Sequence, residues 1–501
     1  MNDLINGILL VLNVKSILMM TLGAILGVVV GAIPGLTGTM AIALVLPITL
    51  YVSPWMGIPL ILGIYKASGW SGSVGSILLG TPGNAAAAAM VLDGYPMKQQ
   101  GKGMKALKAS LVCGVFADFG SDVITILVCA PLATLALMFG PPEFMLLIIM
   151  ALMVIASVGA GSFWKAVIAA ALGLFFSLVG MDPVLSTPRL TFGMYQLLSG
   201  INLVPLLIGA FAFSEMIQKM MNMTEDSAVI KTSLNPSELK ENNSYTFREF
   251  RSTFKSVVRS TLIGTWIGLL PGIGSGVSPW VGYSAAKRSS KHPEEFGKGS
   301  LEGLVAAQAA SNSVAGANLI PLLSLGIPGD TTAALLIGVM MAHGLIPGPL
   351  IFDRTPDAVY AIFATLIICD LVYLLVGLVT CRVCGNITMV RNSVLVPIVT
   401  VLCVIGTYAY NKSIFDVFVM VFFGLLGFAM KRNGVNVPIF VIAFILGSMF
   451  ETNFRQSLVL LDGNLLAALG RPVSAVCALM IVGMVISNLY RFYKERKKNA
   501  A

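Results

Sequence analysis

The sequence has few charged residues. Of its 501 residues, 11% are charged and 56% are hydrophobic, whereas a soluble globular chain has about 25% charged residues. So little polar surface excludes an ordinary soluble globular protein. We therefore expect most of the chain to lie in a lipid bilayer.

Groups that catalyse reactions or bind metals are also scarce. The two histidines, His292 and His343, have no set of partner residues, and no Gly-x-x-x-x-Gly-Lys-Ser/Thr loop is present to bind a nucleotide. The one Cys-x-x-Cys, at Cys381 and Cys384, has neither a second pair nor a nearby histidine to complete a metal site. We expect buried free thiols, no metal, no cofactor, no ATP motor and no catalytic residues.

Long apolar runs recur along the chain. A helix needs about 20 apolar residues to cross a bilayer, and clear runs of this kind are Ile17–Ile33, Phe144–Ala160, Ala358–Thr380, Phe415–Met430 and Val473–Leu489. The runs do not alternate polar and apolar residues, as a transmembrane β-barrel would require. The predicted fold is an all-α polytopic membrane protein with about 10–12 transmembrane helices and some broken helices or hairpins.

The formal net charge of +9 does not indicate a nucleic-acid partner. The basic residues lie in short loops between apolar runs and in the C-terminal segment from Arg491 to Lys498, which is the positive-inside pattern of membrane proteins. The first residues include Asp3 and no basic cluster. We therefore expect no cleavable signal peptide, and we expect the first apolar segment to remain in the mature chain.

The longest polar stretch lies at 219–255. Two helix starts are predicted in it, one at the Asn-Pro-Ser-Glu sequence that begins at Asn235 and one at a capping box formed by Thr246 and Glu249. The stretch is either a surface linker with an amphipathic helix on the membrane face or a plain solvated connector. It separates a first transmembrane repeat, 1–218, from a second repeat with C-terminal helices and a basic cytoplasmic tail, 256–501.

The two sides of this linker repeat each other weakly. GVVVGAIPGLTG, from Gly27, corresponds to GTWIGLLPGIGS, from Gly264, and LLGTPGN corresponds to SLGIPGD. In the first half, the lysines of Lys98–Lys108 follow the second motif. In the second half, the lysines of Lys287–Lys298 follow the first motif. If basic loops face the cytoplasm, the two repeats have inverted topology, as in many secondary transporters.

Each half thus contains two Pro-Gly breaks inside apolar sequence. A break frees backbone N–H and C=O groups, which a membrane tolerates only beside protein or a water-filled cavity. The N-terminus of a half-helix favours a carboxylate, and free carbonyls suit Na+. The predicted substrate-binding residues are Pro34, Gly35, Thr37, Lys66, Ser71, Ser73, Pro82, Gly83, Asn84, Pro271, Gly272, Ser275, Asn312, Pro328, Gly329 and Asp330. The glycines upstream of the breaks, such as Gly27 and Gly264, are expected to serve helix packing.

Ionisable residues within apolar sequence are costly and are functional by default. Lys66 either pairs with an anionic substrate or snorkels from a helix end. Asp118 and Asp122 are four residues apart and so share one helix face. Together with Thr331 they are candidates to bind a coupling Na+ or H+. The alternative is that the two aspartates lie at the membrane interface. Asp330 is either a ligand or the N-cap of the next half-helix.

These motifs carry a strong resemblance to a known family. The stretches are GAIPGLTGTMAIALVLPIT, SILLGTPGNAAAAAMVLDGYPM, FGPPEFMLLIIMALMV, DPVLSTPRLTFG with VPLLIGAFAFSE, LPGIGSGVSPWVGYSAAKRSSKHPEEFGKGSLEG and LIPLLSLGIPGDTTAALLIGVMMAHGLIPGPLIF. They cover most of residues 23–360 in the family's order. The chain resembles the large, TctA-type membrane subunit of the tripartite tricarboxylate transporters.

The resemblance implies a multi-pass subunit of the bacterial inner membrane. It implies a small membrane subunit and a periplasmic solute-binding protein as partners, and uptake of carboxylates with a cation gradient. The sequence departs from the family pattern at 65–72 and at Gln308, so the resemblance leaves the particular carboxylate open. The competing readings are an anion channel and an intramembrane enzyme, and the enzyme would need a nucleophile with a base, or a metal cluster.

Overall fold

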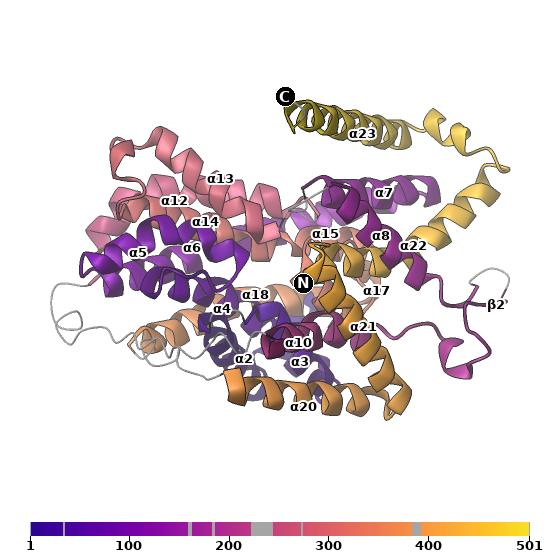
Figure 1. Cartoon of the computed structure of the whole chain (residues 1–501), viewed down its shortest axis with the longest axis horizontal. Helices are drawn as coiled ribbons and strands as arrows, with labels where there is room; N and C mark the ends of the chain where they lie inside the picture. Colours follow the sequence, from indigo (N-terminus) through magenta and orange to yellow (C-terminus); the bar gives the residue numbers. More distant parts are fainter. Residues whose placement is uncertain are drawn as a thin grey trace.

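The chain forms a bundle of α-helices in a computed structural model (Figure 1). The structure describes residues 2–33, 36–158, 163–182, 186–221, 244–271, 274–382 and 392–499. Up to Met221 the elements are α1 (Asn2–Val11), α2 (Val14–Ala32), α3 (Gly38–Thr49), α4 (Pro54–Leu78), η1 (Ala85–Met90), α5 (Val91–Gln99), α6 (Gly103–Leu137), α7 (Pro141–Val158), α8 (Phe163–Ser177), β1 (Gly180–Met181), β2 (Pro188–Arg189), η2 (Tyr195–Leu197), α9 (Leu203–Leu207), η3 (Ile208–Phe213) and α10 (Ser214–Met221).

In the residues that are described, the second part of the chain forms helices joined by loops. Its elements are α12 (Phe247–Gly268), α13 (Gly274–Ser289), η4 (Pro293–Glu295), α14 (Leu301–Ala317), α15 (Leu319–Leu325), α16 (Thr331–Ala342), α17 (Ile351–Arg354), α18 (Pro356–Cys381), α20 (Asn392–Asn411), α21 (Ile414–Arg432), α22 (Val437–Leu460), η5 (Leu465–Gly470) and α23 (Pro472–Asn499). The capping box predicted at Thr246 and Glu249 is confirmed at the start of α12. The helix start predicted at Asn235 lies outside the described residues.

Six helical segments in the described ranges are long and apolar enough to cross a membrane. They are α2, α6, the continuous segment made by α9, η3 and α10, α18, α21 and α22. Shorter apolar helices include α3, α7, α8 and α16. The five clear runs predicted from the sequence fall on α2, α7, α18, α21 and α23. The prediction of an all-α polytopic membrane fold is therefore confirmed.

The two halves are assembled through equivalent contacts. α2 packs along α4 in the first half, and α12 packs along α14 in the second. Glycines allow both close approaches, because a Cβ at Gly27 would lie 2.6 Å from the Ile64 carbonyl oxygen and one at Gly264 would collide with the backbone of Ala310. α6 of the first half then packs on α14, and α18 of the second half packs on α4. The inverted orientation of the two halves remains a prediction.

The basic loops that follow α5 and α13 lie side by side. Asp93 Oδ1 accepts hydrogen bonds at 2.8–3.0 Å from the backbone N–H groups of Gly297, Gly299 and Ser300. Gln100 Nε2 donates to the Lys298 carbonyl oxygen at 2.8 Å. These loops belong to different halves of the chain but occupy one end of the molecule, near α5 in Figure 1.

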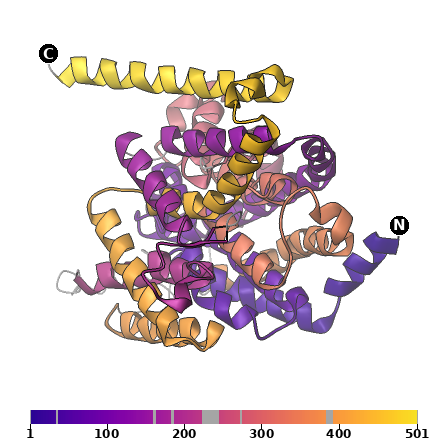
Figure 2. The same cartoon turned by 90° about the vertical axis from the view of Figure 1, so that its right-hand side faces the viewer.

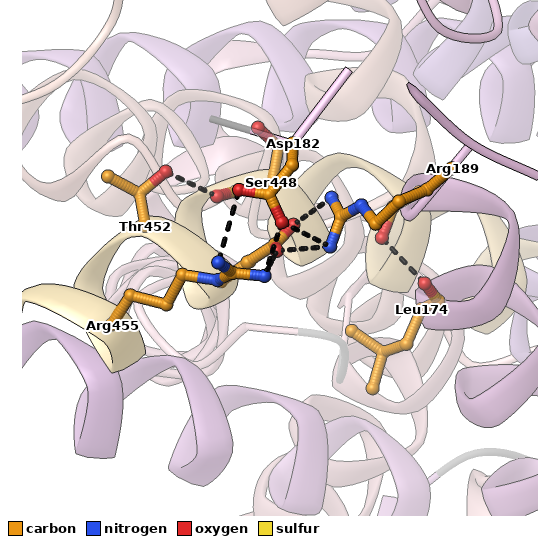
Figure 3. A network of polar contacts seen from close by, with 8 residues as sticks. Leu174, Asp182, Arg189, Ser448, Thr452 and Arg455 are labelled. Atoms are coloured by element: carbon orange, nitrogen blue, oxygen red, sulfur yellow. Dashed lines mark hydrogen bonds and ion pairs between the residues drawn. The ribbon is translucent and has the colours of Figure 1, made fainter. Parts of the chain in front are cut away.

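An ion-pair network lies at the opposite end, where Figure 1 shows β2. β1 and β2 pair antiparallel, and Arg189 of β2 donates from Nη1 to Glu451 Oε1 of α22 at 2.6 Å. Arg455 Nη2 donates to Asp182 Oδ2, also at 2.6 Å, so both arginines converge on Asp182 (Figure 3). The hydrogen bond to Glu451 raises the pKa of Arg189, which keeps the guanidinium charged. The network fastens the hairpin to α22.

The C-terminal helix α23 runs along one edge of the molecule, apart from the N-terminal helix α1 (Figure 2). α23 packs on α7, where Arg471 Nη1 and Ser474 Oγ donate to the Glu143 carboxylate at 3.1 and 3.0 Å. Five cysteines in the described ranges are free and buried, as expected: Cys113, Cys129, Cys369, Cys403 and Cys477. Cys381 is also buried, and Cys384 lies outside the described ranges. These five cysteines contribute to packing rather than to cross-links.

Candidate functional site

A cavity of about 320 Å³ lies among α3, α4, α13, α14 and α16. Its wall includes residues just after each of the four predicted breaks, two breaks in each half. These wall residues are Thr37, Gly38 and Thr39, then Asn84, Ala85 and Ala86, then Ser275 and Gly276, and finally Asp330, Thr331 and Thr332. Cavities of about 300–1,000 Å³ are typical of small-molecule sites. Segments far apart in the sequence therefore enclose one space large enough for a small molecule.

A capped helix start follows three of these breaks. The side chains of Thr37, Asn84 and Asp330 each accept a hydrogen bond from the backbone N–H three residues later, at 3.3, 2.8 and 2.7 Å. Thr, Asn and Asp are good N-caps, so the chain restarts a helix at each position. The N-cap alternative for Asp330 is thus confirmed. The starts of α3 and α16 bring backbone N–H groups without intrahelical partners to the cavity wall.

Direct hydrogen bonds join the two halves beside the cavity. The hydroxyls of Thr39 and Thr332 lie 3.3 Å apart. Tyr65 OH donates to Asp330 Oδ2 at 3.1 Å, and Asn318 Nδ2 donates to Tyr65 OH at 2.9 Å. Any rearrangement of one half against the other would therefore change the shape of this cavity.

Lys66 lies in the middle of α4 and is buried, so the snorkelling alternative is wrong. Its ammonium donates to Asp122, to Asp370 Oδ1 at 2.5 Å and to the Leu366 carbonyl oxygen at 3.3 Å. These contacts use all three donors of the ammonium. Lys66 reaches the cavity wall, but in this structure it pairs with carboxylates of the protein, so we no longer expect it to bind the substrate directly.

Asp118 and Asp122 are buried on one face of α6, as their spacing predicts, and neither lies at an exposed interface. Asp118 Oδ2 accepts hydrogen bonds from Tyr373 OH at 2.6 Å and from Asn312 Nδ2 at 3.0 Å. Asp118 Oδ1 has no hydrogen-bond partner among the described residues. Asp118 is part of the cavity wall, whereas Asp122 pairs with Lys66 instead.

The wall contains some of the predicted site residues and not others. It includes Thr37, Lys66, Asn84, Ser275, Asn312, Asp330, Asp118 and Thr331. Ser71 and Ser73 are not part of it, because their hydroxyls donate to the carbonyl oxygens of Gly27 and Trp70 at 2.9 and 2.7 Å. The break residues themselves are not part of the wall where they are described: Pro82, Gly83, Pro271, Pro328 and Gly329. Pro34, Gly35 and Gly272 lie outside the described residues.

Sequence reasoning missed the partners that α18 contributes. Asp370 pairs with Lys66, and Tyr373 bonds Asp118. Asp370 is a lone carboxylate inside the apolar run Ala358–Thr380, and the criterion that singled out Lys66 would also have found it. Tyr65 was missed as well, because an aromatic residue in an apolar helix is ordinary packing material.

The described residues contain no group of three or more His, Cys, Asp or Glu side chains placed to hold a metal ion. The carboxylates near the cavity are engaged instead with Lys66, Tyr65, Tyr373 and amide groups. The arrangement offers hydrogen-bond donors, buried acids and helix N-termini around an open space. Such a set of groups suits recognition of a small polar molecule.

Comparison with known proteins places the chain in a family. The model of the Tripartite tricarboxylate transporter TctA family matches residues 17–442. An Agrobacterium vitis protein named "Uncharacterized 52.8 kDa protein in TAR-I ttuC' 3'region" is 33% identical over 479 residues, which are 95% of this chain and 94% of that protein. A second, "Uncharacterized protein in TAR-II ttuC' 3'region", from the same organism, is 30% identical over 222 residues, which are 44% of this chain and 91% of that protein. The chain therefore belongs to the tripartite tricarboxylate transporter TctA family and is a multi-pass membrane component of such a transporter.

Proposed function

We propose that this chain is the subunit through which a small organic anion, a tricarboxylate or another carboxylate, crosses the bacterial inner membrane. Uptake is driven by a gradient of Na+ or H+. A periplasmic solute-binding protein delivers the substrate, and a small membrane subunit completes the system. The observation that carries the proposal is the cavity lined by residues that follow all four Pro-Gly breaks.

The chemistry of the wall supports an anionic substrate. α3, α13 and α16 begin at the cavity, and the N-terminus of a helix carries a partial positive charge. The hydroxyls of Thr39, Ser275 and Thr332 lie on the wall as hydrogen-bond donors for carboxylate oxygens. The substrate is thus bound by dipoles, while the charge of Lys66 is used within the protein.

The arrangement of the helices supports a carrier. Both halves contribute to the cavity, and the same kinds of contacts build each half. Two halves of inverted topology can exchange shapes, which opens a central site to alternate sides of the membrane. In this proposal the contact between Thr39 and Thr332 is one of those that form and break during the cycle.

A cavity-filling variant tests the proposal. Gly276 is part of the wall, and a Cβ added there meets nothing within 4 Å. Gly276→Leu therefore places its Cβ in open space at the cavity wall. Gly483 in α23 is the matched control, because a Cβ there also meets nothing within 4 Å and the residue is exposed, far from the wall.

The measurement is uptake of labelled carboxylates into proteoliposomes that contain both partner subunits, with protein content compared on gels. We expect wild type and Gly483→Leu to accumulate substrate against its gradient, and Gly276→Leu to insert normally but to lose at least about tenfold in uptake, or about 1.4 kcal/mol. Wild-type uptake by Gly276→Leu would contradict the site. Equilibration without accumulation in the wild type would contradict a carrier and indicate a channel.

A further inference from the structure

The buried charges around α4, α6 and α18 do not balance. Lys66 supplies one positive charge, whereas Asp118, Asp122 and Asp370 would supply three negative charges if all were ionised, and each of the four residues is at most 1% exposed. Burial of a carboxylate costs several kcal/mol even after the protein relaxes. Buried acids without a counter-ion therefore take up protons or bind cations.

The contacts distinguish the three acids. Asp122 and Asp370 both touch the Lys66 ammonium. Asp118 bonds only neutral donors, and both of them, Tyr373 OH and Asn312 Nδ2, bond its Oδ2. Its Oδ1 is buried and has no partner in the described ranges. This is the pattern of a carboxylic acid, in which the carbonyl oxygen accepts two hydrogen bonds and the other oxygen carries the proton.

The surroundings of Asp118 favour a proton over a metal cation. Gln308 Nε2 donates to Asn312 Oδ1 at 2.7 Å, which orients the Asn312 amide so that its N–H groups face Asp118. Tyr373 also presents a hydrogen. A bound Na+ needs lone pairs from several oxygens, whereas these neighbours offer hydrogens. The titratable groups that face Asp118 are Tyr65 and Lys66 on α4, Asp122 on α6, and Cys369, Asp370 and Tyr373 on α18.

We propose that Asp118 is the proton-binding residue of this transporter, with an exchangeable proton on Oδ1. A proton from water in the cavity joins the carboxylate and later leaves, so Asp118 alternates between an acid and a carboxylate and no other bond changes. Because Asp118 is part of the substrate cavity wall, its carboxylate repels an anion, whereas its acid form removes that repulsion. The coupling of proton to substrate rests on the proposed function, but the proton site itself does not.

Infrared spectroscopy of the purified protein in lipid tests the site without any substrate. A protonated carboxyl group has a C=O stretch that shifts when H2O is replaced by D2O. We expect the wild type to show such a band, Asp118→Asn to lose it, and Asp416→Asn to keep it. Asp416 is the control because it is also buried, but on α21, and it accepts hydrogen bonds from Asn202 and Asn411.

A second variant keeps the test decisive if Asp118→Asn does not fold. Tyr373→Phe removes one of the two hydrogen bonds to the Asp118 carbonyl oxygen, so the band should move to higher frequency without disappearing. Replacing K+ by Na+ at constant pH should leave the band unchanged. A wild-type spectrum without the band, a band that Asp118→Asn retains, or a band that Na+ removes would each overturn the proposal. None of these outcomes depends on uptake, which can succeed or fail separately.

Discussion

Removing the Lys66 ammonium leaves Asp122 and Asp370 in the interior without a counter-ion. The side chains of all three residues are at most 1% exposed. Removing one partner of a buried ion pair typically costs about 3–5 kcal/mol, because the remaining charge is left uncompensated. We therefore expect Lys66→Met to lower the free energy of unfolding by about 3–5 kcal/mol, a large part of the 5–15 kcal/mol or so that stabilises a typical domain.

The charge balance, rather than the loss of contacts, should set this cost. Asp370→Asn also removes one ion pair, but it leaves the single positive charge of Lys66 paired with the single negative charge of Asp122. Its expected cost is that of an ordinary hydrogen bond, about 0.5–1.5 kcal/mol. A triple variant, Lys66→Met with Asp122→Asn and Asp370→Asn, removes all three charges and should recover most of the loss, because neutral replacement of a buried ionic group is often neutral or stabilising.

A thiol-reactive fluorophore can follow unfolding of these variants in detergent. Cys113, Cys129, Cys369, Cys403 and Cys477 are free and buried, so they become reactive when the helices separate. From most to least stable, we expect the order wild type, Asp370→Asn, triple variant and Lys66→Met, with the triple variant well above Lys66→Met. Equal losses in Lys66→Met and Asp370→Asn, or a triple variant no better than Lys66→Met, would refute the charge-balance reasoning.

Three further predictions follow from the ends of the molecule. Single cysteines can be placed in the basic loops after α5 and α13 and in the C-terminal tail. Each should react only with reagents that reach the cytoplasm. Labelling of any of them from the periplasm would contradict the inverted repeats. Partial burial raises the pKa of Glu249, but hydrogen bonds from Lys105 and Thr246 outweigh it and leave the pKa below its ordinary value. The ionised Glu249 carboxylate therefore stabilises the fold above about pH 4.3, and this stabilisation is lost as the pH falls through the lower pKa of the folded state. Glu249→Gln should be less stable than the wild type by about 1 kcal/mol at pH 7 and equal to it in acid. A stability difference that persists in acid would contradict this. Arg189→Met should release the hairpin from Glu451 and speed its proteolysis, with a stability loss of about 1.5–3 kcal/mol, and unchanged proteolysis would count against the network.

The sequence predicts the parts of this fold that depend on local chemistry. The apolar runs become helices, and the capping residues Thr37, Asn84 and Asp330 mark where helices restart after the breaks. The repeated Pro-Gly motifs indicate a central site, and residues beside them line the cavity. These features are encoded within a few residues of one another, so periodicity and motif spacing are enough to detect them.

Side-chain partners across the bundle were not predictable in the same way. Lys66 and Asp370 are 304 positions apart, and their contact depends on α18 crossing to α4, which no local pattern specifies. Ser73 illustrates the reverse error, because its hydroxyl donates to a carbonyl oxygen of its own helix three residues earlier and never reaches the cavity. A polar residue in a membrane helix has such an intrahelical option, and the sequence alone does not show which option it takes.

A cross-link between Thr39 and Thr332, whose hydroxyls lie 3.3 Å apart, tests whether the two halves meet at one substrate cavity. The double variant T39C/T332C is made in a chain without native cysteines, with a protease site inserted in the polar stretch between the halves. After oxidation and proteolysis, we expect the halves to stay joined on a gel, uptake to stop, and a reductant to restore uptake. Halves that separate after oxidation, or undiminished uptake in the cross-linked protein, would contradict a substrate cavity shared by the two halves.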